Sequence, residues 1–310
     1  MQNKTLLNSL FFTFSLFGSF FVLDKPLNAD DLDPVCPDPS KTEITSIYNP
    51  DDKTSFFELT GGYGEEGGGF CRGTPEQYGV TVFKMGFCKK NPANPTGSSI
   101  LEGSKPRYDL ESGNCTWAFE STSGEAADFS VGGSVDLSEV ASSSPAAGTY
   151  PHAVMIISKD FRIKGKYGPV AGKTYYTNGK FEESSTNISD YAVTTAPLKS
   201  FSGPTECTAT TENNVVEGGT ISAYLLDANG TILVSDSEDD TGAPCSGMEK
   251  LLGVMNMSSD LIISDTIKGL KMTFLVKDNG MSVISGGGEN QPPSKLIMDS
   301  GPFSVTFETF

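Results

Sequence analysis

Histidine is almost absent from this chain: among 310 residues only His152 occurs. A lone histidine excludes a metal centre built from several imidazole ligands. No C-x2-C pair is present, so the usual zinc sites of cysteine and histidine are not expected. A Ser-His-Asp triad needs only one histidine, but no G-x-S-x-G turn accompanies it. We interpret His152 as an ordinary residue at a strand edge, and we assign no catalytic or cofactor-binding residue.

Positive charge is also scarce. The chain has 22 Lys and Arg residues against 39 Asp and Glu residues, which gives a formal net charge of −17. A surface this acidic repels the phosphate backbone of nucleic acids, so nucleic-acid binding is not expected. The simplest explanation of the acidity is solubility outside the cell.

Only one run of residues is both long and apolar. Leu6–Leu23 carries no charge, follows Lys4 and ends at Asp24, and a small residue offers a cleavage position at Ala29. This layout predicts a secretory signal peptide over residues 1–29. The alternative is an uncleaved anchor, because the run is close to the shortest length that spans a membrane. Since no later segment is apolar enough to span, we expect an exported protein of the periplasm, cell surface or medium.

Six cysteines follow the predicted signal peptide. An even number in an exported chain indicates a disulfide framework. The sequence alone allows many pairings. We expect cysteines that are neighbours along the chain to pair, as Cys36–Cys71, Cys88–Cys115 and Cys207–Cys245.

Apolar and polar residues alternate in the stretches between loops. The pattern is clearest in Thr81–Phe87, Phe161–Tyr167, Met272–Lys277 and Phe303–Glu308. In the first of these, all four odd-numbered residues are expected to share one face. Half-buried antiparallel strands produce this period of two. Together with the Gly- and Pro-rich loops, it predicts an all-β fold of one or more antiparallel β-sandwiches with long loops, stabilised by disulfides.

Three Asn-Gly pairs mark expected turns, at Asn178-Gly179, Asn229-Gly230 and Asn279-Gly280. Asn-Gly suits the tight type I′ turn of a β-hairpin. The last pair is expected to join the strands Lys271–Lys277 and Met281–Ser285. At most one short helix is expected, around Met248–Met255.

A segment rich in Ser, Ala and Pro divides the rest of the chain. We interpret residues 138–150 as a linker or a crossover. An N-terminal β region over residues 30–137 then holds the first four cysteines, and a C-terminal β region over residues 151–310 holds the last two. The two regions could equally form one continuous domain.

The densest acidic run is the candidate metal site. It contains Asp236, Glu238, Asp239 and Asp240. Oxygen-rich loops bind calcium, but this run departs from the EF-hand template, since Thr241 stands where that loop needs glycine. A solvated turn is the simpler interpretation. Calcium is the one cofactor that we consider.

A basic stripe is predicted on one strand, where Arg162, Lys164 and Lys166 project from the same face. The segment Phe201–Phe310 is acidic. Opposite charges on one molecule permit head-to-tail contact between copies, so the stripe is our candidate surface for a homo-oligomer or filament. The simpler interpretation is a solvated outer face.

Three classes of function remain. The first is an exported structural or adhesive protein of the cell surface or extracellular space, such as a filament or coat subunit. The second is a module that binds a sugar or another small ligand, with Trp117 and the tyrosines as stacking surfaces. The third is a hydrolase that uses two carboxylates. We rank the enzyme last, because acids are too common here to point to a site.

Overall fold

The computed structural model describes residues 34–49, 51–60, 69–93, 110, 113–130, 145–201, 207–216, 218–233, 245–264, 270–286 and 295–309. The predicted signal peptide lies outside these ranges. The helices are α1 (Phe56–Leu59) and the 3-10 helix η1 (Ile188–Asp190). The strands are β1 (Phe70–Gly73), β2 (Gln77–Cys88), β3 (Cys115–Ser130), β4 (Gly148–Ser158), β5 (Asp160–Lys164), β6 (Lys166–Val170), β7 (Lys173–Tyr176), β8 (Thr194–Pro197), β9 (Thr210–Val216), β10 (Gly219–Asp227), β11 (Met248–Ile263), β12 (Leu270–Leu275), β13 (Met281–Gly286), β14 (Lys295–Ser300) and β15 (Ser304–Thr309).

Antiparallel strands dominate, so the predicted all-β fold is confirmed. The large sheet has the order β8-β5-β2-β4-β11-β10-β9, and β3 pairs with β2 beside this path. Smaller sheets are formed by β1-β13-β14, β12-β15 and β6-β7. Strands from the two predicted regions share the large sheet, because β2 pairs with both β4 and β5. The segment interpreted as a linker is described from residue 145 on, and its last three residues belong to β4.

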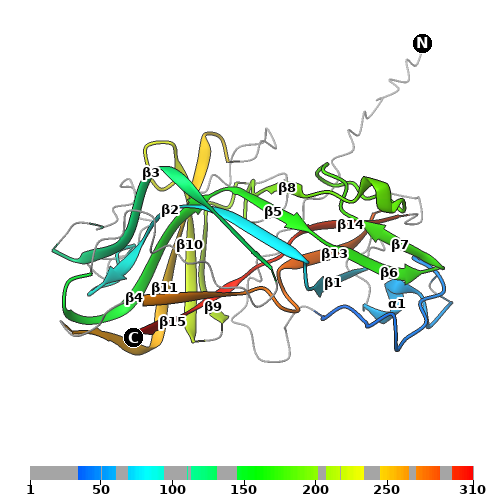
Figure 1. The fold of residues 1–310 in the computed structure, drawn as a ribbon, viewed down its shortest axis with the longest axis horizontal. Coiled ribbons are helices and arrows are strands. Elements are labelled where there is room, and N and C mark those ends of the chain that lie inside the picture. Colours follow the sequence, from blue (N-terminus) through cyan, green and yellow to red (C-terminus); the bar gives the residue numbers. More distant parts are fainter. Residues whose placement is uncertain are drawn as a thin grey trace, which may run out of the picture.

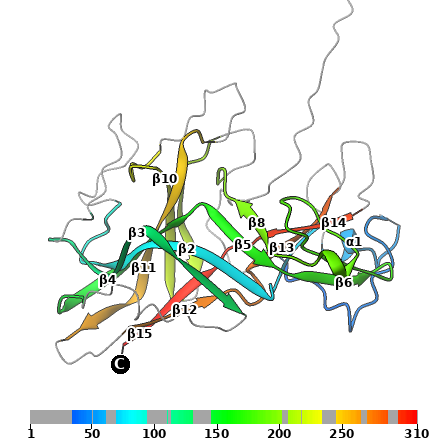
Figure 2. The ribbon, with the colours of Figure 1, turned by 45° about the horizontal axis from the view of Figure 1, so that its top comes forward.

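A long, kinked hairpin runs along the molecule. The chain passes from β12 to β13 and returns from β14 to β15, so that β13 pairs with β14 and β12 with β15. In both views this ribbon extends from β15, near β11, to β14, near β6 and α1 (Figure 1, Figure 2). At the kink, the Gly301 amide donates to the Gly280 carbonyl at 2.9 Å.

The hairpin predicted at Asn279-Gly280 is therefore wrong. The Gly280 amide donates to the Val276 carbonyl at 2.8 Å, and Asp278 adopts a φ of 55°. These residues make a local kink within one side of the ribbon, and the chain does not reverse there. At Asn229-Gly230 the chain does reverse, since the Asp227 amide donates to the Thr231 carbonyl at 2.9 Å.

The middle of the large sheet, around β4, β10 and β11, is buried on both faces. On β4, Ala153 and Ile157 contribute to the main core, which also contains Val283 and Met298 of the small sheet β1-β13-β14. Val154 and its neighbours belong to a second apolar cluster on the opposite face. The main core thus lies between the large sheet and the ribbon, an arrangement consistent with the predicted sandwich.

The helix predicted around Met248–Met255 is wrong, because these residues form the first half of β11. Leu251 and Met255 face the main core, whereas Leu252 and Val254 face the second cluster. A strand buried on both faces has a continuous apolar run, and such a run does not distinguish a strand from a short helix.

A bulge in β2 breaks the predicted alternation. The pairing register shifts between Val82 and Lys84. Val82, Met85 and Phe87 are therefore all in the main core, whereas Phe83 packs against the second cluster. A bulge adds one residue and exchanges the faces beyond it, so the expectation of a single shared face was wrong.

Candidate functional site

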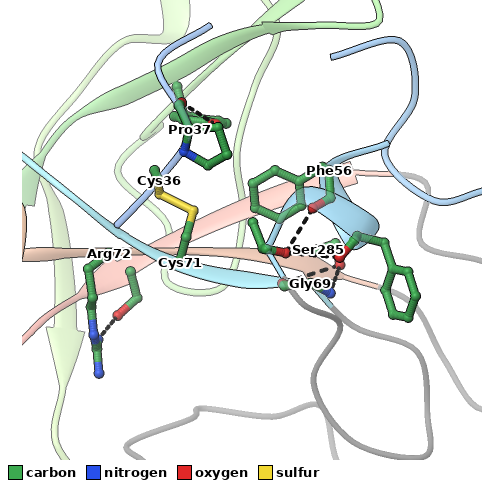
Figure 3. The surroundings of a disulfide bond; sticks show 11 residues. Cys36, Pro37, Phe56, Gly69, Cys71, Arg72 and Ser285 are labelled. Atoms are coloured by element: carbon green, nitrogen blue, oxygen red, sulfur yellow. Dashed lines mark hydrogen bonds between the residues drawn. A yellow bond between two sulfur atoms is a disulfide. The ribbon is translucent and has the colours of Figure 1, made fainter. Parts of the chain in front are cut away.

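The described chain contains three disulfides, and they are the pairs expected between sequence neighbours: Cys36–Cys71, Cys88–Cys115 and Cys207–Cys245. The first holds the segment before α1 against β1, where the Cys36 amide also donates to the Arg72 carbonyl at 2.7 Å. Figure 3 shows this bond beside Phe56, with Arg72 pointing to the opposite side of β1. The second joins two residues that face each other across β2 and β3.

Arg162, the first residue of the basic stripe, is engaged within its own chain. Its guanidinium binds the Asp128 carboxylate at 2.9 Å and donates to the Thr81 hydroxyl at 3.1 Å. Arg162, Gly79 and Asp128 face each other across β5, β2 and β3. A Cβ at Gly79 would lie 2.0 Å from the Asp128 carboxylate. The glycine therefore leaves room for the ion pair to cross the middle strand.

The other two cations of the stripe also have partners in the chain. The Lys164 ammonium lies 4.5 Å from the centre of the Tyr191 ring, and Lys166 pairs with Glu76 at 2.8 Å. This pairing lowers the pKa of Glu76 and raises that of Lys166. The predicted single strand is divided, since Arg162 and Lys164 lie on β5 and Lys166 lies on β6 of another sheet, and much of the charge of the stripe is compensated internally. Its role in self-association stays a prediction.

His152 lies on β4, in register with Cys88 and Asn256. Burial lowers its pKa, and the charge of Asp260 opposes this shift. Its Nδ1 atom has no hydrogen-bond partner among the described residues. The neutral imidazole is thus the favoured form at neutral pH. Trp117 packs against the second apolar cluster and over Gly86, which fits a role in packing.

The acidic run Asp236, Glu238, Asp239 and Asp240 lies outside the described residues. Within the described ranges, no group of His, Cys, Asp or Glu is arranged to hold a metal ion. The same ranges contain no helix that is long and apolar enough to cross a membrane.

Sequence analysis missed a row of buried polar residues. Arg72 on β1, Ser282 on β13 and Asp299 on β14 face each other in register across the small sheet. Their exposed fractions are 5%, 1% and 4%. The Arg72 guanidinium donates to the Ser282 hydroxyl, and it lies 4.5 Å from the centre of the Phe70 ring. Burying such groups costs free energy of folding unless they are paired. This row is the main polar feature of the small sheet.

Charged residues in the segment after β7 shift the pKa of Asp299 in this row. The pKa of Asp299 is raised to about 6, mainly by burial and to a smaller extent by the negative charge of Glu182. The Ser300 amide, Arg72 and Lys199 act in the opposite direction. Burial also raises the pKa of Glu182. We call Arg72, Glu182, Lys199, Ser282 and Asp299 the Asp299 cluster.

The Asp299 cluster can bind and release a proton near neutral pH. Two carboxyls that influence each other also occur in hydrolases, and here the side chain of Asp299 is 4% exposed, so any ligand would reach it only after a movement of the surrounding chain. The only sequence signal was an aspartate directly after the apolar run Leu296–Met298, within a strand whose two faces are both buried.

Comparison of the chain with protein-family models, with curated proteins and with solved structures found no match.

Proposed function

We propose that the chain is an exported structural or adhesive protein that acts at the cell surface or in the extracellular space. The observation that carries this proposal is the set of three disulfides in an antiparallel β-fold. Disulfides form and persist in oxidising compartments and are rare in the cytosol. They also restrict the unfolded chain, which suits a protein exposed to proteases and mechanical load.

Labelling of intact cells with a membrane-impermeant amine reagent tests this proposal. Lys41 and Lys53 are suitable targets, since their side chains are 80% and 83% exposed. We expect labelled protein on intact cells, or recovery of the protein from the medium. Labelling that requires cell lysis, with an intracellular marker as the control, would contradict the proposal.

A filament or coat would need contacts between copies, and the basic stripe is our candidate for them. Lys164→Glu is the informative variant, because it removes a contact with an aromatic ring and leaves the ion pairs of Arg162 and Lys166 in place. We expect it to weaken assembly in sedimentation experiments at low salt. The matched control is Lys173→Glu, at an exposed position on β7. Equal assembly of both variants would remove the stripe as the contact.

A ligand-binding module is the second candidate, and the Asp299 cluster favours it. The cluster combines buried charges of both signs with the ring of Phe70 beside Arg72. Binding sites often hold a few polar groups in apolar surroundings. A thermal-shift screen with neutral and charged sugars should find a ligand whose effect is lost in Asp299→Asn. A screen without any such ligand would count against this candidate.

A further inference from the structure

We propose that Asn229 is a site of N-linked glycosylation, where an oligosaccharide carried on a lipid pyrophosphate is transferred to the side-chain amide. The inference rests on the export proposed above, because this transfer takes place on the side of a membrane that faces away from the cytosol. It assigns a modification to a part of the chain that has no role in the functions considered so far.

Four asparagines after the predicted signal peptide stand in the acceptor pattern Asn-x-Ser/Thr, in which x is any residue except proline. They are Asn114, Asn187, Asn229 and Asn256. The pattern alone does not distinguish among them. The fold does, because an attached oligosaccharide is bulky and hydrophilic and belongs on the surface.

Asn114 is closed to modification in the fold. It is 7% exposed, and both ends of its side-chain amide bind the backbone of Lys90. The Lys90 amide donates to its Oδ1 atom at 2.9 Å, and its Nδ2 atom donates to the Lys90 carbonyl at 3.3 Å. The next residue, Cys115, forms the disulfide with Cys88. An oligosaccharide on this Nδ2 atom would have to occupy space that the fold fills.

Asn187 and Asn256 are exposed, but each is part of a hydrogen-bonded element. Asn187 caps η1, since its Oδ1 atom accepts from the Ser189 amide at 3.1 Å. Asn256 lies within β11, in register with His152 of β4 and Thr220 of β10. A transferase that draws either segment into its active site would break the cap of η1 or the pairing of the sheet.

Asn229 lies in the exposed turn that follows β10. Asn229 and Ala228 are both exposed, and the Gly230 amide donates to the Asp227 carbonyl at 3.0 Å across the turn. Gly230, the middle residue of the acceptor pattern, has a φ of 83°, which glycine adopts without strain. The acceptor pattern therefore lies in a sharp bend at a surface position, where a chain reaches an enzyme with little disturbance of its fold.

An acidic residue accompanies this acceptor pattern. Asp227 stands two positions before Asn229, and its carboxylate accepts from the Thr231 amide at 2.8 Å. Hydrogen bonds from Thr231 and Asn229 lower the pKa of Asp227, so the carboxylate is ionised at neutral pH. Some bacterial transferases of this class require an acid at this position. The other three asparagines have Ser112, Ser185 and Val254 there.

The transfer replaces one bond by another and needs no oxidant or reductant. A bond forms between the Nδ2 atom of Asn229 and C1 of the first sugar, and the bond from this carbon to the pyrophosphate oxygen breaks. The lipid pyrophosphate leaves with the electron pair of that bond. One proton of the side-chain amide passes to a base of the transferase.

Peptide mapping by mass spectrometry tests the assignment. The full protein is recovered from the surface or medium of the cells that make it, and its peptides are compared before and after treatment with an amidase that removes N-linked oligosaccharides. We expect an oligosaccharide on the peptide that contains Asn229 and none on the peptide that contains Asn114. Asn229→Gln and Thr231→Ala should each abolish the modified form, because they remove the amide that accepts the sugar and the hydroxyl that the pattern requires. Thr231→Ser keeps the hydroxyl and should keep the oligosaccharide, as should the control Asn187→Gln.

Two results would overturn this inference alone. The first is disulfide-bonded protein from outside the cytosol whose Asn229 peptide carries no sugar. The second is an oligosaccharide on the Asn229 peptide that survives in Thr231→Ala. Protein found only in the cytosol with reduced cysteines would instead contradict the proposed surface role, and this inference with it.

Discussion

Replacing Asp299 by asparagine should stabilise the protein at neutral pH and have little effect in acid. The carboxyl has an ordinary pKa of 3.8 and a pKa of about 6 in the fold, mainly because burial disfavours its charged form. Each pKa unit corresponds to about 1.4 kcal/mol, so the ionised carboxyl costs the folded state about 3 kcal/mol. Attraction from Arg72 and Lys199 is already contained in this net value.

The sign follows from proton linkage. A carboxyl whose pKa is raised by folding binds its proton more tightly in the folded state. Below pH 3.8 both states are protonated, and the cost is absent. Between pH 3.8 and 6 the cost grows, and above pH 6 it is complete. Asp299→Asn should therefore be about 3 kcal/mol more stable than the parent chain at pH 7.5, and nearly equal to it at pH 3.5.

Urea denaturation at several pH values, followed by circular dichroism, measures this difference. Comparing the variant with the parent at each pH isolates Asp299 from acids with the opposite behaviour, such as Asp52, whose pKa is lowered to about 2. Glu249→Gln, at an exposed carboxyl on β11, is the control and should stay within about 0.5 kcal/mol at every pH. Destabilisation of Asp299→Asn at neutral pH would refute the reasoning, because Asp299 would then be ionised and favourably paired.

Three further substitutions have expected outcomes in thermal or urea denaturation. Gly79→Ala should cost about 1 kcal/mol, because its Cβ would displace the Asp128 carboxylate from the ion pair across β2. Gly301→Ala should cost about 3 kcal/mol or more, since its Cβ would lie 1.9 Å from the Asn279 carbonyl oxygen and the backbone of the kink would have to move. Tyr78→Phe should cost about 1 to 2 kcal/mol, because its hydroxyl donates to the Gly301 carbonyl at 3.0 Å in a buried site.

Gly113→Ala is the matched control for the glycine variants, because a Cβ there meets nothing within 4 Å. It should change the free energy of unfolding by less than about 0.5 kcal/mol. If Gly79→Ala and Gly301→Ala behaved like this control, the close contacts of Gly79 with Asp128 and of Gly301 with Asn279 would be contradicted. A Tyr78→Phe variant as stable as the parent would show that the Gly301 carbonyl finds another donor.

The strand content was predictable because its signal is local. Phe161 and Ile163 are buried, and the alternate residues Arg162 and Lys164 are only half-buried, as the period of two requires. The disulfide partners followed from proximity along the chain. The calcium site at Asp236 and its acidic neighbours stays a prediction, since these residues lie outside the described ranges.

The errors have one physical source, which is tertiary context. A bulge between Val82 and Lys84 exchanges faces, and a periodic pattern does not reveal where a bulge occurs. Because β11 is buried on both faces, its sequence has a continuous apolar run that resembles that of a short helix. The pairing of Asp299 with Ser282 depends on a register between strands that no local motif sets, so the Asp299 cluster became visible only in the fold.

Mass mapping of the cysteines in protein isolated without reductant tests the central claim most directly. The three disulfides predict cross-linked peptides that join Cys36 to Cys71, Cys88 to Cys115 and Cys207 to Cys245, with no cysteine modified by an alkylating reagent. Free alkylation of all six cysteines in folded protein would contradict both the cross-linked fold and the proposal that this chain acts outside the cytosol.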